Sequence, residues 1–170
     1  MINKLEIINE TRLCLYKTFP EIKRGKCLYS TLCLAFVLQE KKIPFLVQAG
    51  SLSYPRLNPE QDDGRPETCT HFSFIWEPRS EATLRAIAEN RLPEIHVWMY
   101  LPETMEIVDL TTHEFPCLCK EYSGLDWLGD KPPDYIWCKI EHLPRNVFYE
   151  ADMSAINYVL SCMKIILGQK

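Results

Sequence analysis

Residues 94–110, EIHVWMYLPETMEIVDL, indicate the fold class of this chain. Apolar, aromatic and β-branched residues dominate on both sides of Pro102-Glu103-Thr104, a pattern typical of two strands joined by a tight turn. The stretch therefore predicts a β-hairpin and with it an antiparallel sheet. If the turn centres near Glu103, His96 and Asp109 lie roughly opposite each other and point to the same face.

The segments around this hairpin carry helical and strand-like patterns. Helical patterns mark residues 2–18, 27–41, 80–90 and 152–168, and strand-like runs occupy residues 44–53, 70–76 and 134–140. Residues 54–69 are rich in Pro, Asp and Gly and predict a long loop. The order predicts an α+β fold in which an antiparallel sheet packs against a helical layer. With no internal repeat or linker in the sequence, we expect residues 1–170 to form a single domain.

Charge and hydropathy argue against several classes of protein. The formal net charge is −4 at pH 7, and no large basic cluster is present, so we expect no nucleic-acid partner. The longest apolar stretch, Leu28 to Leu38, is too short to span a bilayer, and the N-terminus lacks a signal-peptide pattern. We therefore expect a cytoplasmic protein without a membrane partner, whose eight cysteines are free thiols. Without a Gly-rich phosphate loop, the sequence predicts no cofactor.

Cys27 is the predicted nucleophile. It opens the apolar helix expected over residues 27–41, directly after a loop that contains Gly25. A thiol at a helix N-terminus lies near unpaired backbone N–H groups and the positive end of the helix dipole, which favour the thiolate. The backbone N–H of the same residue can bind a developing oxyanion. Cys14 and Cys33 lie within predicted helices, where a thiol lacks this support.

A thiolate nucleophile requires an imidazole base, and the imidazole requires a group that orients it. His96 is the predicted base, and Asp109 is predicted to fix its tautomer and to stabilise the imidazolium. His71 is the rival base, but no acid follows it at hairpin distance, and it is also a candidate substrate contact in the cleft. Gln48 is a candidate to assist at the oxyanion. Trp98 is a candidate substrate contact, although packing is the more common role for such a residue.

These pieces resemble the transglutaminase-like superfamily, which includes transglutaminases, peptide:N-glycanases, bacterial transglutaminase-like proteases and the related arylamine N-acetyltransferases. The matching pieces, which together span residues 25–112, are GKCLYSTLCLAFVL (25–38), IPFLVQAG (43–50), HVWMYLP (96–102) and IVDLTT (107–112). The resemblance implies a papain-like fold with Cys27 as nucleophile, His96 as base and Asp109 as orienting group. Leu28 stands where animal transglutaminases usually have Trp, which argues against glutamine–lysine cross-linking.

The expected function is thiol-dependent hydrolysis or acyl transfer on an amide or thioester through an acyl-Cys27 intermediate. A protease, an amidase, a transglutaminase or an acyltransferase would use the same residues on a peptide, a protein or a small molecule. One alternative is a binding module that kept the fold and lost the chemistry. Another is a zinc-stabilised interaction domain, because soft ligands are available at His113, Cys117, Cys119, Cys138 and His142. The usual C-x2-C pair is missing from that set, so we predict no metal site.

Overall fold

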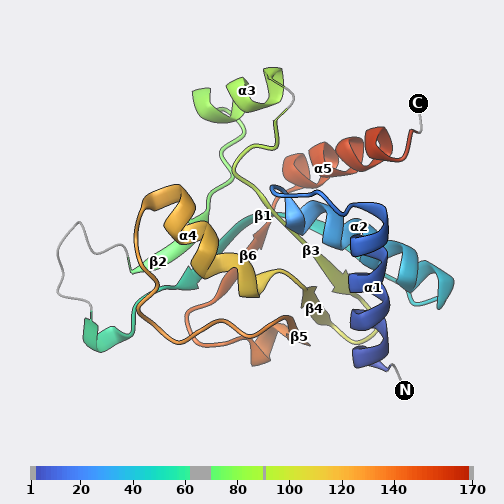
Figure 1. Ribbon diagram of the computed structural model, residues 1–170, viewed down its shortest axis with the longest axis horizontal. Coiled ribbons are helices and arrows are strands. Elements are labelled where there is room, and N and C mark those ends of the chain that lie inside the picture. Colours follow the sequence, from blue (N-terminus) through green and yellow to red (C-terminus); the bar gives the residue numbers. More distant parts are fainter. Residues whose placement is uncertain (1–2, 62–69, 90, 169–170) are drawn as a thin grey trace.

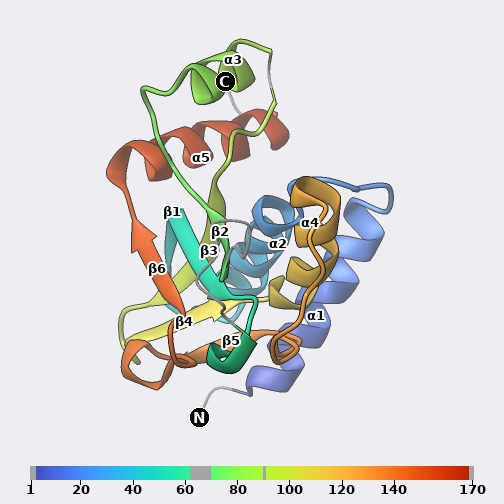
Figure 2. The ribbon, with the colours of Figure 1, turned by 90° about the vertical axis from the view of Figure 1, so that its left-hand side faces the viewer.

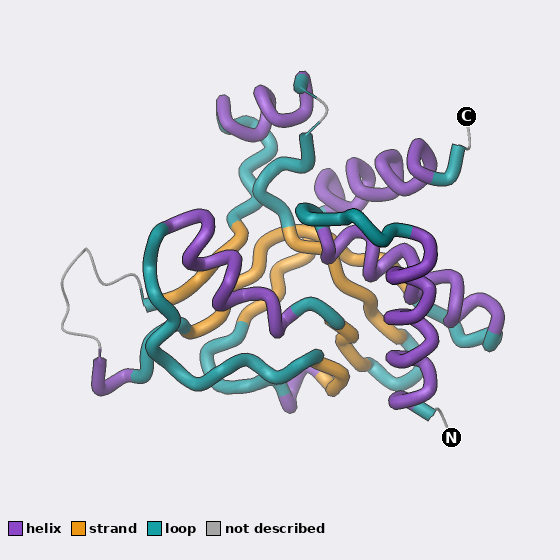
Figure 3. Tube along the Cα trace, in the orientation of Figure 1, coloured by secondary structure: helices purple, strands orange, loops and turns teal. Residues whose placement is uncertain are grey.

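The computed structural model describes residues 3–61, 70–89 and 91–168, which form an α+β fold (Figure 1). The helices are α1 (Lys4–Thr18), α2 (Lys26–Glu40), α3 (Glu81–Ala88), α4 (Phe115–Ser123) and α5 (Met153–Ile166). The strands are β1 (Leu46–Pro55), β2 (His71–Phe74), β3 (His96–Leu101), β4 (Glu106–Asp109), β5 (Ile136–Lys139) and β6 (Phe148–Ala151). Figure 3 shows the strands at the centre, with the helices around them. The second half of the predicted loop over 54–69 lies outside the described residues, and in its first half β1 extends to Pro55.

Helix starts follow the capping groups that the sequence provides. Ser80 caps α3 and Asp152 caps α5, each through side-chain hydrogen bonds to backbone N–H groups of the first turn. The N-cap of α2 is Gly25, whose φ of 68° is a left-handed conformation that glycine adopts without steric cost. Because Gly25 has no side chain, no side-chain cap engages the N–H groups of the first turn of α2.

All strand pairs in the sheet are antiparallel. The order is β2-β1-β3-β4-β5, and β6 is added to β1. Figure 2 shows how strongly the sheet curls, with β6 beside β1 and with β4 turned across them. The predicted antiparallel sheet is therefore confirmed.

Strands β2 and β3 lie end to end along one edge of β1. β3 pairs with Leu46–Gly50 of β1, and β2 pairs with Leu52–Pro55. β6 pairs with Gly50–Ser53, a range that overlaps both, so β6 occupies the opposite edge of β1. The chain leaves the sheet after Phe74 and re-enters it at His96. Helix α3 belongs to this excursion, which stands away from the sheet in Figure 1.

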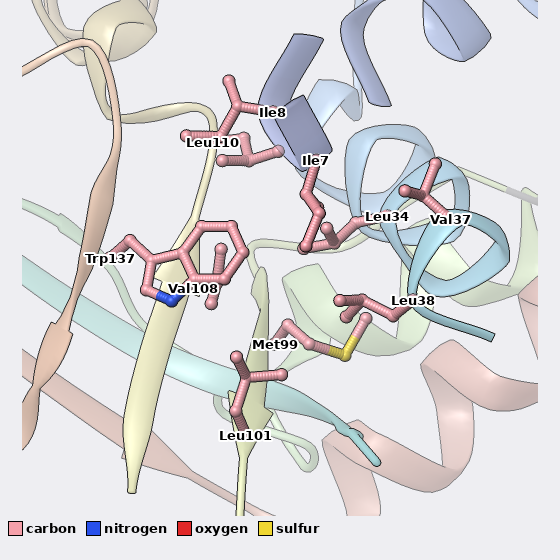
Figure 4. Close-up of a cluster of buried hydrophobic side chains, with 10 residues drawn as sticks. All are labelled: Ile7, Ile8, Leu34, Val37, Leu38, Met99, Leu101, Val108, Leu110 and Trp137. Atoms are coloured by element: carbon pink, nitrogen blue, oxygen red, sulfur yellow. The ribbon is translucent and has the colours of Figure 1, made fainter. Parts of the chain in front are cut away.

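The sheet has a hydrophobic core on each face. Along β3, Val97 and Met99 pack on the face of α1, α2 and α5, whereas Trp98 between them packs on the other face. Figure 4 shows the core between α1, α2 and the strands, which consists of Ile7, Ile8, Leu34, Val37, Leu38, Met99, Leu101, Val108, Leu110 and Trp137. The core of the opposite face is rich in aromatic residues and includes Phe115 of α4. The predicted helical layer corresponds to α1, α2 and α5, and α4 covers the second face, which the sequence did not predict.

Two further findings concern the described residues outside the sheet as well as within it. The cysteines among them are all unpaired, and Cys69 lies outside those residues. Across the described parts of the chain, no helix is both long enough and apolar enough to cross a membrane.

Candidate active site

The hairpin of β3 and β4 brings His96 and Asp109 together inside the protein. Nε2 of His96 lies 2.7 Å from Oδ2 of Asp109, and each side chain is 1% exposed. The predicted pairing of these residues is off by two positions. Met99 pairs with Val108, so that Trp98 falls opposite Asp109 and His96 lies diagonal to it. Because side chains alternate with a period of two, this shift leaves His96 and Asp109 on the same face.

The carboxylate of Asp109 accepts hydrogen bonds on both oxygens. The backbone N–H and the hydroxyl of Thr111 donate to Oδ1 at 2.9 and 2.8 Å. The hydroxyl of Tyr149, on β6, donates to Oδ2 at 2.8 Å, the same oxygen that contacts His96. Burial opposes the charged carboxylate, but His96 and then Thr111 outweigh it and lower the pKa of Asp109. Asp109 is therefore a buried anion whose hydrogen bonds hold it in one orientation.

Aromatic rings enclose the imidazole of His96. The ring of Phe74 stacks on it with centroids 5.2 Å apart, and the ring of Trp98 stacks at 6.1 Å. Phe115 of α4 meets it edge-on at 5.6 Å. These rings exclude water from the imidazole, so its hydrogen bond to Asp109 lies in a low dielectric.

The electrostatics of His96 favour the imidazolium. Burial alone would lower the pKa of His96, but the charge of Asp109 and the hydrogen bond to it, followed by the interaction with Cys27, raise it to about 10. The other ring nitrogen, Nδ1, is buried, and within the described residues no hydrogen bond of ordinary geometry reaches it. The thiol of Cys27 therefore acts on the ring and contributes to the raised pKa of His96. Nδ1 is the ring nitrogen left to exchange a proton.

Cys27 lies in the first turn of α2, as predicted, and is 9% exposed. The N–H groups of Leu28 and Tyr29 both donate to the carbonyl of Gly25, at 2.9 and 3.3 Å. In the described parts of the chain, no acceptor engages the N–H of Cys27. One helical turn later, the hydroxyl of Thr31 donates to the carbonyl of Val97 at 3.4 Å. This contact joins the start of α2 to the start of β3, where His96 lies.

Cys27 and His96 both line a cleft of about 1150 Å³. Its walls come from the start of α2, from β2, from the excursion that carries α3, and from α4 and α5. Asp109 is not part of the lining and lies behind His96. A thiol and an imidazole at the wall of a cleft, with a buried carboxylate behind them, are the groups required for nucleophilic attack followed by proton transfer.

The structure places the other candidate residues as follows. His71 begins β2 and lines the cleft, and its Nδ1 lies 3.0 Å from the hydroxyl of Thr70. Trp98 is 3% exposed and packs against His96, so its place is in the core and not on the cleft surface. Gln48 lies opposite Trp98 on β1 and is not among the residues that line the cleft. Among the three, only His71 lies where a substrate in this cleft would pass.

The candidate zinc ligands do not form a cluster in the described structure. Within the described residues, no group of three or more potential metal ligands is close enough to hold an ion. Cys119 is buried in the aromatic core, whereas Cys117, two residues away on α4, is exposed. His113 instead contacts the carbonyl of Asp134 at 3.1 Å. Their positions do not support the zinc-stabilised alternative.

Sequence reasoning missed Tyr149 and the role of Thr111 toward Asp109. Thr111 follows Asp109 by two positions, and an aspartate side chain commonly accepts a hydrogen bond from the backbone N–H two residues on, so a local signal was available. Tyr149 carries no such signal, because it reaches Asp109 from β6, forty positions along the chain. Its place depends on the pairing of β6 with β1.

Comparisons with known proteins show that the fold of this chain is similar to that of one solved structure. No protein-family model and no curated protein matches the chain. A crystal structure described only as that of a genomics target aligns with a TM-score of 0.53. The two chains are 14% identical, and the alignment covers 98% of this chain and 75% of that chain. At this identity the likeness concerns the fold alone.

Proposed function

We propose that this protein is a thiol-dependent hydrolase or acyltransferase that forms an acyl-Cys27 intermediate from an amide or a thioester. The observation that carries the proposal is the buried His96–Asp109 pair, which leaves Nδ1 of His96 without a hydrogen-bond partner among the described residues, in a cleft wall that also contains Cys27. The proposal includes a papain-like fold of the transglutaminase-like type. The sequence resemblance over residues 25–112 supports that part.

The reaction proceeds in two stages. The Cys27 thiolate attacks the substrate carbonyl carbon, and a C–S bond forms while the carbonyl oxygen becomes an oxyanion. The N–H of Cys27 donates to that oxyanion. Nδ1 of the His96 imidazolium then gives its proton to the leaving amine or thiol, and the C–N or C–S bond to the leaving group breaks. In the second stage, water or an amine loses a proton to Nδ1 as it attacks the acyl carbon, a C–O or C–N bond forms, the C–S bond to Cys27 breaks, and the thiolate is restored.

Asp109 serves this cycle without contacting the substrate. Its hydrogen bond to Nε2 directs Nδ1 toward the thiol and stabilises the imidazolium before the proton is transferred. Thr111 and Tyr149 hold the carboxylate in place. Asp109 is therefore a positioning residue, and Cys27 and His96 are the proposed catalytic residues.

The proposal is tested by trapping the acyl-enzyme. Mixing the protein with p-nitrophenyl acetate is expected to release a burst of p-nitrophenolate and to leave an acetyl group on Cys27, as located by peptide mass spectrometry. The Cys27→Ala variant should show neither. The matched control is Cys162→Ala, because Cys162 lines the same cleft but has no contact with His96. An acetyl group that is found on Cys162 or Cys119, or absent, would contradict the proposal.

A further inference from the structure

Strand β2 contributes its whole length to the wall of the cleft. Residues 71–75 all line it. Successive side chains of a strand point to opposite faces, so a run of consecutive lining residues means that the edge of the strand faces the cavity. β2 pairs with β1 on its other side. Among the described strands, none pairs with the edge that faces the cleft.

The backbone groups of Ser73 point away from β1 and toward the cleft. Hydrogen-bonded and non-hydrogen-bonded pairs alternate along an antiparallel ladder. The N–H of Arg56 donates to the carbonyl of Thr70 at 2.8 Å, so with the observed register Ser53 and Ser73 form a non-hydrogen-bonded pair. Their hydroxyl oxygens lie 3.0 Å apart, as the closer spacing of such a pair allows. The N–H and C=O of Ser73 are therefore directed outward.

The next outward N–H of this edge already has an acceptor. Two residues after Ser73, the N–H of Ile75 donates to Oε1 of Glu94 at 3.2 Å. No such acceptor contacts the N–H of Ser73 within the described parts of the chain. Phe74, between Ser73 and Ile75, stacks its ring on His96 at 5.2 Å. A group bound to the backbone of Ser73 would therefore lie next to the side of the cleft that holds His96 and Cys27.

We propose that the outer edge of β2 at Ser73 is a main-chain binding site that takes the substrate as an added strand, so that the substrate is an extended polypeptide. This inference rests on the proposed acyl-transfer function and names its substrate class. A polypeptide supplies one carbonyl and one N–H at the spacing that a strand edge accepts, which a small thioester does not. Alternate side chains of the added strand then meet the apolar walls of the cleft, which include Leu92, Ile95, Phe115 and Leu118.

The first test changes only the ligand. The probe is an extended pentapeptide of alanine and leucine with a C-terminal vinyl sulfone, which alkylates a thiol. The rate of Cys27 labelling is measured for this peptide and for analogues N-methylated at one amide at a time. We expect one or two amides at alternate positions to be sensitive, with about tenfold slower labelling, the effect of losing one hydrogen bond. Equal rates across the whole methylated series would overturn the inference.

The second test changes the edge itself. Ser73→Pro removes the outward N–H, and an edge strand tolerates proline at a position that is not bonded to its neighbour. The readout is the rate of the unmethylated probe divided by the rate of iodoacetamide on Cys27, and we expect about a tenfold fall in this ratio. The matched control is Ser53→Ala, which breaks the same contact between the two serine hydroxyls but leaves the edge intact. Equal ratios in the two variants contradict the inference.

These tests separate the inference from the proposed function. Iodoacetamide needs no strand pairing, so a Cys27 that reacts selectively with iodoacetamide but shows no N-methylation pattern keeps the proposed function and rejects the polypeptide site. A Cys27 that reacts with neither reagent rejects both. If Ser73→Pro does not fold, the N-methylated series decides alone, since it uses the unmodified protein.

Discussion

Among the residues of the site, Asp109 accepts the most hydrogen bonds. Its two oxygens accept hydrogen bonds from His96, Tyr149 and, twice, Thr111. A buried carboxylate is tolerated only when such donors replace water. Tyr149 and His96 contact the same oxygen, Oδ2, so the hydrogen bond from Tyr149 weakens the attraction between Oδ2 and the His96 ring. Burial and then Asp109 raise the pKa of Tyr149 well above its ordinary value, so its hydroxyl stays protonated and donates at neutral pH.

Removing this donor should move the titration of His96. In Tyr149→Phe, His96 is the remaining hydrogen-bond partner of Oδ2 of Asp109 among the described residues. The negative charge on Oδ2 then stabilises the imidazolium more strongly, so the pKa of His96 rises above its value of about 10. The imidazolium is lost as pH rises through this pKa, so we expect the alkaline limb of the p-nitrophenyl acetate reaction to shift to higher pH. Urea unfolding should show a loss of about 1.5 kcal/mol, as for a hydrogen bond to a charged group.

The control for this prediction is Tyr54→Phe. Tyr54 belongs to the same aromatic core and loses the same hydroxyl, but it makes no contact with Asp109. Its pH profile should overlay that of the unmodified protein. If the Tyr149→Phe profile overlays it as well while stability falls, Tyr149 is only a structural residue.

The parts of the site that the sequence predicted are those that depend on local geometry. Cys27 follows a loop and opens an apolar helix, and His96 and Asp109 flank a single hairpin, so each is placed by its own element. Even a register error of two residues left the pair on one face. Tyr149 could not be found in this way, because only the tertiary pairing of β6 with β1 brings it to Asp109.

Among the elements, β1 positions the site, because three other strands, β2, β3 and β6, pair with it. β2 and β3 meet end to end on one edge, and β6 occupies the other edge. Gly50 lies at this junction, paired with both His96 and Ala151. A Cβ at Gly50 would come within 2.1 Å of the carbonyl oxygen of Glu150, so the close approach of β6 requires glycine here.

Gly50→Ala should therefore displace β6 and with it Tyr149. The clash involves backbone atoms, which cannot rotate away, so we expect a loss of about 2 kcal/mol or more in the free energy of unfolding, measured in urea. The pH profile of the p-nitrophenyl acetate reaction should shift in the same direction as that of Tyr149→Phe.

Gly124→Ala is the comparison for this change. A Cβ at Gly124 meets nothing within 4 Å, but its φ of 73° is left-handed, so only backbone strain of about 1 kcal/mol is expected. Its pH profile should remain that of the unmodified protein. If Gly50→Ala is as stable as Gly124→Ala, β6 moves to accommodate the Cβ at little cost in free energy. The claim that the close approach of β6 requires glycine at position 50 would then be wrong.

Elements with a long periodic pattern were predicted, and short ones were missed. Helices α1, α2 and α5 carry 14 or 15 residues with recurring apolar positions, and their expected ranges agree with the structure. β6 has four residues, most of them exposed, so it shows no alternation that could reveal a strand. α4 is nine residues long and begins at a proline-containing turn, and it was also missed. Its absence from the prediction is the reason why a second packed face was not expected.

For the whole molecule, the proposed function assigns the reaction to one of several cysteines that line the cleft. Cys27, Cys119 and Cys162 all line the cleft, so a position on the cleft wall does not by itself distinguish them. Cys33 lies in the core, where burial, followed by the interaction with Cys14, raises its pKa to about 12. Among the described cysteines, Cys27 is the one that acts on His96. In the proposed mechanism, this charged neighbour makes Cys27 the reactive thiol.

The most direct test of the account is the rate at which each cysteine reacts with iodoacetamide at pH 6. The pKa of His96, raised to about 10, keeps the ring charged at this pH, and the proposed mechanism requires this charge beside Cys27. An ordinary thiol with a pKa of about 8.5 is almost wholly protonated there, so we predict Cys27 to react about 30- to 100-fold faster than the other cysteines. His96→Ala should abolish this difference. Slow and uniform labelling of all the cysteines, or a loss of selectivity in His71→Ala but not in His96→Ala, would contradict the account.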